Sequence, residues 1–146
     1  MALATLYMLI RQFEGCKLVA YLCPAGVWTC GFGSTGPDVV QGTVWPLAYA
    51  LQRMQADAQM FSTSTLRLCP GLQGNLLAAI ADFAYNLGLT RLKGSTLRRR
   101  ILVGDWRGAC DELGKWVNGG GRRLRGLLVR RAAEVMLVQA ATRPRA

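Results

Sequence analysis

Three side chains near the N-terminus have the chemical types needed for proton transfer to and from a bound substrate. Eight residues separate Glu14 from Cys23, and five separate Cys23 from Thr29. A carboxyl group can protonate a leaving group, whereas a thiolate or a hydroxyl can activate or hold a water molecule. The chain contains no histidine, which excludes the usual Ser-His-Asp and Cys-His arrangements.

Glu14 stands at an unusual place for an acidic residue. Leu6, Leu9, Ile10 and Phe13 recur with helical spacing, which predicts a helix from about Leu3 to Phe13 that stops at Gly15. The C-terminal end of a helix carries partial negative charge, so it favours the protonated form that a general acid needs. A surface glutamate that tolerates this position remains the alternative.

A β-hairpin is expected directly after this helix. Strands at Leu18–Leu22 and Val27–Phe32 flank a turn at Pro24–Gly26. A hairpin folded back on the helix would bring Cys23 and Thr29 to one cleft with Glu14. Seen alone, each could equally be a buried cysteine and a strand-forming threonine.

The remainder of the chain is expected to be helical. Thr43 is expected to cap a helix from about Trp45 to Phe61, and Gly119–Gly121 is expected to be a flexible break. The segment before Gly88 is apolar all round, which predicts a core helix. The other expected helices are Leu72–Leu87, Leu97–Val103, Trp106–Trp116 with Asp105 as its cap, and about Arg125–Gln139.

Length and charge narrow the class of protein. The 146 residues suffice for one domain, and no stretch is long and apolar enough to cross a bilayer. Residues 1–10 are read as part of the first helix and not as a signal peptide. Eighteen basic and eight acidic side chains give a net charge of +10, which suits a polyanionic partner such as nucleic acid, a membrane face or the bacterial wall.

The cysteines indicate no metal site. The five cysteines are odd in number and match no zinc spacing. A reduced state is the default, and a disulfide between Cys16 and Cys30 is left open.

Three segments resemble the phage-type lysozymes, glycoside hydrolase family 24. FEGCKLVAYLCPAGVWTCGFGSTG is similar to the family signature, in which a Glu is followed after eight residues by an Asp, or sometimes a Cys, and after five more by a Thr. FAYNLG followed by LKGSTLRRRI, and KWVNGGGRRLRGLLVRRAAE, resemble its central and C-terminal segments. The resemblance covers nearly the whole chain.

The resemblance implies an α+β fold dominated by helices, the lysozyme-like fold with two lobes and a cleft between them. Residues 1–146 would form a single domain. Its parts would be an N-terminal hairpin lobe at about 14–42, a linking helix at about 45–61 and a helical lobe at about 71–140.

It further implies a muramidase that hydrolyses the β-1,4 bond between N-acetylmuramic acid and N-acetylglucosamine in peptidoglycan. Glu14 would be the general acid, while Cys23 and Thr29 would position water on the opposite face of the sugar, with inversion preferred. Cys23 stands where a carboxylate is common, so it would act as a thiolate base or as a thiol that only places the water. No cofactor or metal is implied.

Four further residues are expected to bind substrate or support the site. Gly31 permits a close backbone approach, and Ser34 stands where many relatives have His. Arg130 matches an arginine that, in members of this family, pairs with the catalytic glutamate. Asn86 is polar in an apolar helix, so it contacts either substrate or nearby backbone. Asp82 is expected to be structural, and Glu134 to form an ion pair on a helix surface or between helices.

Other functions remain open at this stage. They are a peptidoglycan-binding lysozyme-like protein with weakened catalysis, a glycosidase for chitin-like polymers, and a nucleic-acid binder that only the charge suggests. We expect a monomer that binds peptidoglycan and no specific nucleic acid. It would remain in the host cytoplasm until a separate membrane lesion releases it to the cell wall.

Overall fold

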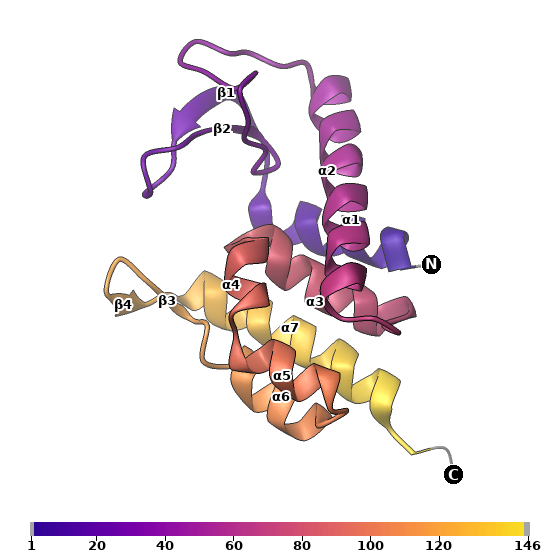
Figure 1. Ribbon diagram of the computed structural model, residues 1–146. Coiled ribbons are helices and arrows are strands. Elements are labelled where there is room, and N and C mark those ends of the chain that lie inside the picture. Colours follow the sequence, from indigo (N-terminus) through magenta and orange to yellow (C-terminus); the bar gives the residue numbers. More distant parts are fainter. Residues whose placement is uncertain (1, 145–146) are drawn as a thin grey trace.

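The computed structural model describes residues 2–144, which contain mainly helices and two small hairpins (Figure 1). Met1 and residues 145–146, which belong to the domain range expected from the sequence, lie outside it. The elements in order are α1 (Ala2–Glu14), β1 (Lys17–Leu22), β2 (Trp28–Gly31), α2 (Leu47–Leu68), α3 (Gly74–Leu87), α4 (Leu89–Lys93), α5 (Thr96–Leu102), α6 (Trp106–Leu113), β3 (Asn118–Gly119), β4 (Arg122–Arg123) and α7 (Arg125–Thr142).

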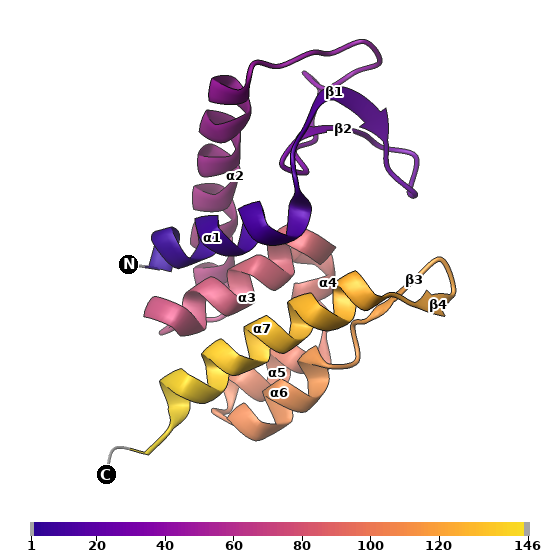
Figure 2. The same ribbon diagram turned by 180° about the vertical axis from the view of Figure 1, so that it is seen from behind.

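Helix α3 is the centre of the helical part, as its apolar sequence predicts. Leu77 to Ala84 are all buried, and α3 packs against α1, α2 and α7 (Figures 1 and 2). One cluster of buried side chains joins α3 to α5, α6 and α7, and a second joins α1, β2 and α2 to the other face of α3. The expected fold class, predominantly helical with a small hairpin, is confirmed.

The β1–β2 hairpin projects beside α2 and away from the other helices (Figure 1). Its strands pair antiparallel, with Tyr21 opposite Thr29, and the register shifts between Lys17 and Tyr21. The backbone of Ala20 donates to Thr43, so the chain before α2 runs along the outer side of β1. The hydrogen bonds between this segment and β1 hold the hairpin in place relative to α2.

The expected cap at Thr43 is wrong, and so are the bounds of the helix after it. The hydroxyl of Thr43 accepts a hydrogen bond from the Val40 amide, and Trp45 donates its amide to Leu18. Because the backbone of residues 43–45 is hydrogen-bonded to β1, α2 begins only at Leu47. It then continues to Leu68, well past the expected end at Phe61.

The expected flexible break at Gly119–Gly121 is a second hairpin. Asn118 pairs with Arg123 and Gly119 with Arg122, and the turn residues Gly120 and Gly121 both have positive φ. Two such residues are what a tight hairpin turn requires.

One helix boundary and one additional helix also differ from the expectation. Helix α6 ends at Leu113 and not at Trp116, and α4 is an additional short helix. By contrast, Ser95 and Asp105 accept backbone amides as helix caps, as expected for Asp105. Within residues 2–144 no helix has the length and apolarity required to cross a membrane.

Candidate active site

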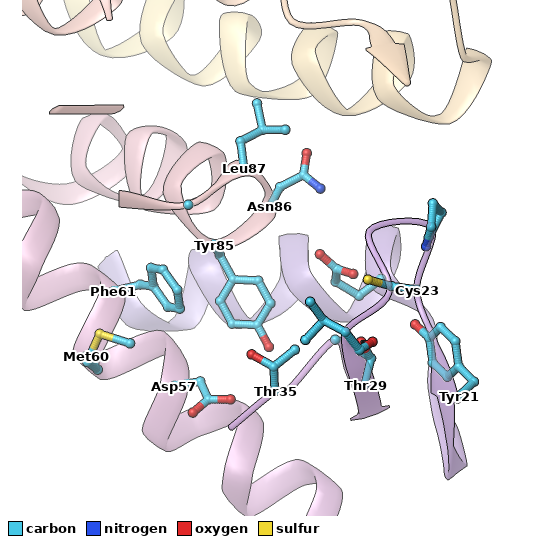
Figure 3. Close-up of a pocket in the computed structure, with 15 residues that line it drawn as sticks. Tyr21, Cys23, Thr29, Thr35, Asp57, Met60, Phe61, Tyr85, Asn86 and Leu87 are labelled. Atoms are coloured by element: carbon cyan, nitrogen blue, oxygen red, sulfur yellow. Dashed lines mark hydrogen bonds between the residues drawn. The ribbon is translucent and has the colours of Figure 1, made fainter. Parts of the chain in front are cut away.

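A cleft of about 720 Å³ lies between the β1–β2 hairpin, α2 and the C-terminal end of α3. Glu14, Cys23 and Thr29 all line it, so the structure brings together the three residues that the sequence singles out. Figure 3 shows Cys23 and Thr29 from the hairpin and Tyr85 from α3 around the same space.

Glu14 is the last residue of α1, and Gly15 leaves the helix with φ of 66°. One carboxylate oxygen, Oε1, accepts a 2.8 Å hydrogen bond from Nη1 of Arg130. The other oxygen, Oε2, lies so close to Gly33 that a Cβ built there would be 2.8 Å away. The side chain is 19% exposed, so it is held on two sides yet open to the cleft.

Arg130 connects α7 to both α1 and α3. Its Nε and Nη2 each donate a 2.8 Å hydrogen bond to Asp82, whose side chain is completely buried. Burial alone would lower the pKa of Arg130, but hydrogen bonds and the charges of Asp82 and Glu14 raise it above its ordinary value. The guanidinium therefore stays charged, and its planar fork fixes the direction of Glu14.

Cys23 lies in the turn of the hairpin. A hydrogen bond from the backbone of Val27 is the main cause that lowers the pKa of its thiol, with smaller contributions from Ala25 and Thr29. Burial opposes this effect only in part. The thiolate is thus favoured by backbone dipoles of its own turn.

Thr29 and Asn86 line the cleft from opposite sides. The hydroxyl of Thr29 donates to the carbonyl of Val27, 3.0 Å away, and its side chain is almost fully buried. The amide oxygen of Asn86 accepts from Nη2 of Arg131 at 2.8 Å. The partner of Asn86 is therefore a side chain, and not the nearby backbone that the sequence allowed.

Gly31 and Ser34 do not line the cleft. Gly31 has φ of 67° and lies against Trp45 and Ala50, at 3.2 Å for an added Cβ. The hydroxyl of Ser34 donates a 2.6 Å hydrogen bond to Asp57, which also accepts from Arg53. Both residues therefore support the wall of the cleft without reaching its surface.

The comparison with known protein families identifies the chain. The family model described as phage lysozyme matches residues 11–134. The chain belongs to the phage lysozyme family. It is therefore an enzyme, a glycoside hydrolase of the muramidase type.

Individual phage lysozymes and related structures agree with this membership. The endolysin of Acyrthosiphon pisum secondary endosymbiont phage 1 is 37% identical over 139 residues, which is 92% of this chain and 94% of that protein. The endolysin from Escherichia coli O157:H7 phage FAHEc1 superimposes with a TM-score of 0.79 at 26% identity, covering 97% of this chain and 94% of that one. The muramidase domain of SpmX from Asticaccaulis excentricus gives 0.82 at 26% identity, covering 95% of both chains.

Three cleft residues of this phage lysozyme family member were not predicted as site residues. Gly33 packs on Glu14, Asp57 of α2 holds Ser34, and Tyr85 donates a 2.6 Å hydrogen bond to the carbonyl of Phe32. Burial raises the pKa of Tyr85, so its hydroxyl remains a donor. Gly33 had a sequence signal, since glycines at 31, 33 and 36 indicate close backbone approaches.

The cysteines carry free thiols in this structure. Cys16 is exposed and Cys30 is buried, so the disulfide left open by the sequence is not formed here. Among residues 2–144, no group of three or more acidic, cysteine or histidine side chains is arranged to hold a metal ion.

Proposed function

We propose that this enzyme cleaves the β-1,4 bond between N-acetylmuramic acid and N-acetylglucosamine in bacterial peptidoglycan, with Glu14 as the proton donor. The observation that carries the proposal is the position of Glu14, mostly buried yet open to the cleft and fixed by Arg130. Because Oε1 is engaged by Arg130, Oε2 is the oxygen left to carry the proton. In the reaction this proton passes to the glycosidic oxygen as its bond to the anomeric carbon breaks.

Cys23 and Thr29 are proposed to act on the opposite face of the sugar. A water molecule held by the two side chains attacks the anomeric carbon, and the Cys23 thiolate accepts its proton. The attack inverts the anomeric configuration. A thiol and a carboxylate remain, and exchange with solvent restores the starting protonation states. The lowered pKa of the Cys23 thiol supports its role as the base.

The wall is the proposed place of action. A polymer with many carboxylates would attract an enzyme of net charge +10, a rate effect that salt weakens. We propose that the enzyme acts as a monomer and reaches the wall after release from the host cytoplasm.

Clearing of a peptidoglycan suspension tests the proposal, with wild type beside Glu14→Gln. Wild type should clear the suspension, and the variant should be slower by about a hundredfold or more, because a general acid contributes about that much. Equal clearing by both proteins would contradict the assignment of Glu14. Binding without clearing by wild type would instead favour the alternative of a wall-binding protein that lost catalysis with the change to Cys23.

A further inference from the structure

The charged residues of the cleft are acidic, although the protein as a whole is strongly basic. The chain carries a net charge of +10, yet within residues 2–144 no lysine or arginine lines the cleft. The charged residues that line it are Glu14 and Asp57. Glu14 is paired with Arg130 and takes part in the proposed reaction. Asp57 is therefore a negative charge in the cleft that the proposed mechanism does not use.

Asp57 is held by two residues that do not line the cleft, and part of its carboxylate stays free. Ser34 donates to Oδ2 at 2.6 Å, and Nε of Arg53 donates to Oδ1 at 3.1 Å. A carboxylate can accept about four hydrogen bonds, so about two positions are left for a ligand. The side chain of Asp57 is 21% exposed and lines the cleft, which makes these positions accessible.

The negative charge of Asp57 is only partly neutralised. Arg53 also pairs with Asp38, so one guanidinium serves two carboxylates and the group of three keeps a net charge of −1. The charge of Asp57 also acts within the cleft, because it is the second cause, after burial, that raises the pKa of Tyr85. A cationic ligand group beside Asp57 would therefore be attracted.

The surroundings of Asp57 combine hydroxyl groups with apolar side chains. Figure 3 shows Asp57 near Thr35 and the hydroxyl of Tyr85, with Met60 and Phe61 farther along the same side of the cleft. Hydroxyl groups can bond to the hydroxyls of a sugar, while apolar side chains can contact the apolar face of its ring. This part of the cleft is therefore suited to a sugar unit.

The sugar at Asp57 is a neighbour of the sugar at Glu14. Gly33 packs on Glu14, and the next residue, Ser34, bonds to Asp57. Because consecutive Cα atoms are only about 3.8 Å apart, the two carboxylates lie on either side of one short stretch of chain. In the proposed substrate the two sugars alternate, so both neighbours of N-acetylmuramic acid are N-acetylglucosamine. Asp57 therefore faces a glucosamine unit whichever way the strand runs.

We propose that Asp57 forms a subsite for the nitrogen on C2 of this glucosamine unit, so that the enzyme also cuts strands in which the nitrogen is a free amine. This inference rests on the proposed function and extends its substrate class. With the acetyl group present, Asp57 accepts a hydrogen bond from the amide N–H. With the acetyl group removed, the amine is protonated and donates a charge-assisted hydrogen bond, which is the stronger of the two.

Two sets of glycan strands of the same length test the subsite. One set is fully N-acetylated, and the other is the same material after a deacetylase has removed the acetyl groups of its glucosamine units. Wild type should cut both sets. In Asp57→Asn, the ratio of kcat/KM on free-amine strands to kcat/KM on acetylated strands should fall about fivefold, the contribution of one partly exposed ion pair. The Asn side chain keeps an oxygen that can accept the hydroxyl of Ser34, so this contact is retained.

Asp111→Asn is the matched control, because it removes an exposed carboxylate that does not line the cleft and should keep the wild-type ratio. A second reading needs no variant. At physiological salt, which screens long-range attraction to the basic surface, the wild-type ratio should fall as pH rises through the pKa of the sugar amine. Only the protonated amine is charged, and the acetylated strands cancel the pH dependence of the enzyme itself.

Equal slowing of Asp57→Asn on both sets would mean that Asp57 only supports the loop, and it would overturn the subsite. So would a wild type that cuts acetylated strands and leaves free-amine strands intact. Failure of wild type to cut either set contradicts the proposed function instead. The affinities of E14Q and E14Q/D57N for both sets then decide on the subsite, and the same loss of ratio is expected.

Discussion

Arg130 and Glu14 are 116 residues apart in the sequence, yet Nη1 of the arginine lies 2.8 Å from Oε1 of the glutamate. The same guanidinium gives its other two contacts to Asp82. One cation is thus shared by two carboxylates, one completely buried and one facing the cleft. Asp82 therefore acts on Glu14 through Arg130, and we class it as a positioning residue.

Asp82→Asn tests this sharing. With Asp82 neutral, Arg130 loses one of the two carboxylates that fix its guanidinium. We expect kcat to fall about tenfold at an unchanged KM, because Glu14 is then held less firmly. The variant should also lose about 3 kcal/mol of unfolding free energy, because Arg130 is almost fully buried.

Asp38→Asn is the control for that variant, since Asp38 pairs with Arg53 in the second turn of α2 and neither residue lines the cleft. It removes the same charge and should leave kcat unchanged. An Asp82→Asn enzyme that is less stable but keeps the wild-type kcat would mean that Asp82 is only structural.

The pH dependence of Cys23 gives a second prediction. If the thiolate is the base, the rate rises with pH through the pKa of Cys23, which lies below the ordinary thiol value of 9.0. Cys23→Asp should move this acidic limb to about pH 4, the range of a carboxylate. Cys23→Ala should remove the limb and lower the neutral rate, while Cys110→Ala, away from the cleft, should behave as wild type. An unchanged limb in Cys23→Asp would rule out a base at this position.

Gly33→Ala should damage catalysis more than stability. The added methyl group would collide with Oε2 of Glu14, and a carboxylate displaced by about 1 Å can cost about a hundredfold in rate. Gly104→Ala is a matched control, because Gly104 has a similar φ of 73° against 79° at Gly33, but nothing lies within 4 Å. Both variants should lose about 1 kcal/mol of unfolding free energy from backbone strain. Equal activity in the two variants would contradict the close approach.

Glu134 should make the protein less stable as pH rises. Burial raises the pKa of this carboxyl well above the usual 4.5, against the lowering charge of Arg131. The folded state then keeps a proton that the unfolded chain releases, so unfolding free energy falls between 4.5 and the raised pKa by up to about 1.4 kcal/mol per pH unit. Glu134→Gln cannot titrate and should lack this contribution. Urea unfolding of both proteins from acid to neutral pH measures the difference, which should grow with pH; a constant difference would contradict the prediction.

Local signals in the sequence explain which elements could be predicted. The β1–β2 hairpin, the cap at Asp105 and the stop at Gly15 depend on nearby residues, and the structure has all three. Thr43 failed as a cap because a long-range contact with β1 decides the conformation there. The glycines at 119–121 were read as flexible, although the positive φ of Gly120 and Gly121 builds a defined turn.

The site was predicted less completely, since its supporting residues meet only in the folded chain. The sequence placed Glu134 in an ion pair, and the structure buries that pair with Arg131 completely. Charged side chains are exposed by default, so the burial of Asp82 and Glu134 had no local signal. Asp57 enters the cleft from a helix whose predicted bounds gave no reason to choose it.

The chemical identity of the new chain end tests most directly whether Glu14 drives cleavage after N-acetylmuramic acid. Peptidoglycan digested by wild type should be reduced with borohydride and analysed for the sugar at the reducing end. A muramidase with Glu14 as its proton donor should form new reducing ends that are N-acetylmuramic acid, and these should be absent from a Glu14→Gln digest. New ends that carry N-acetylglucosamine, or muramic acid ends that persist in Glu14→Gln, would contradict it.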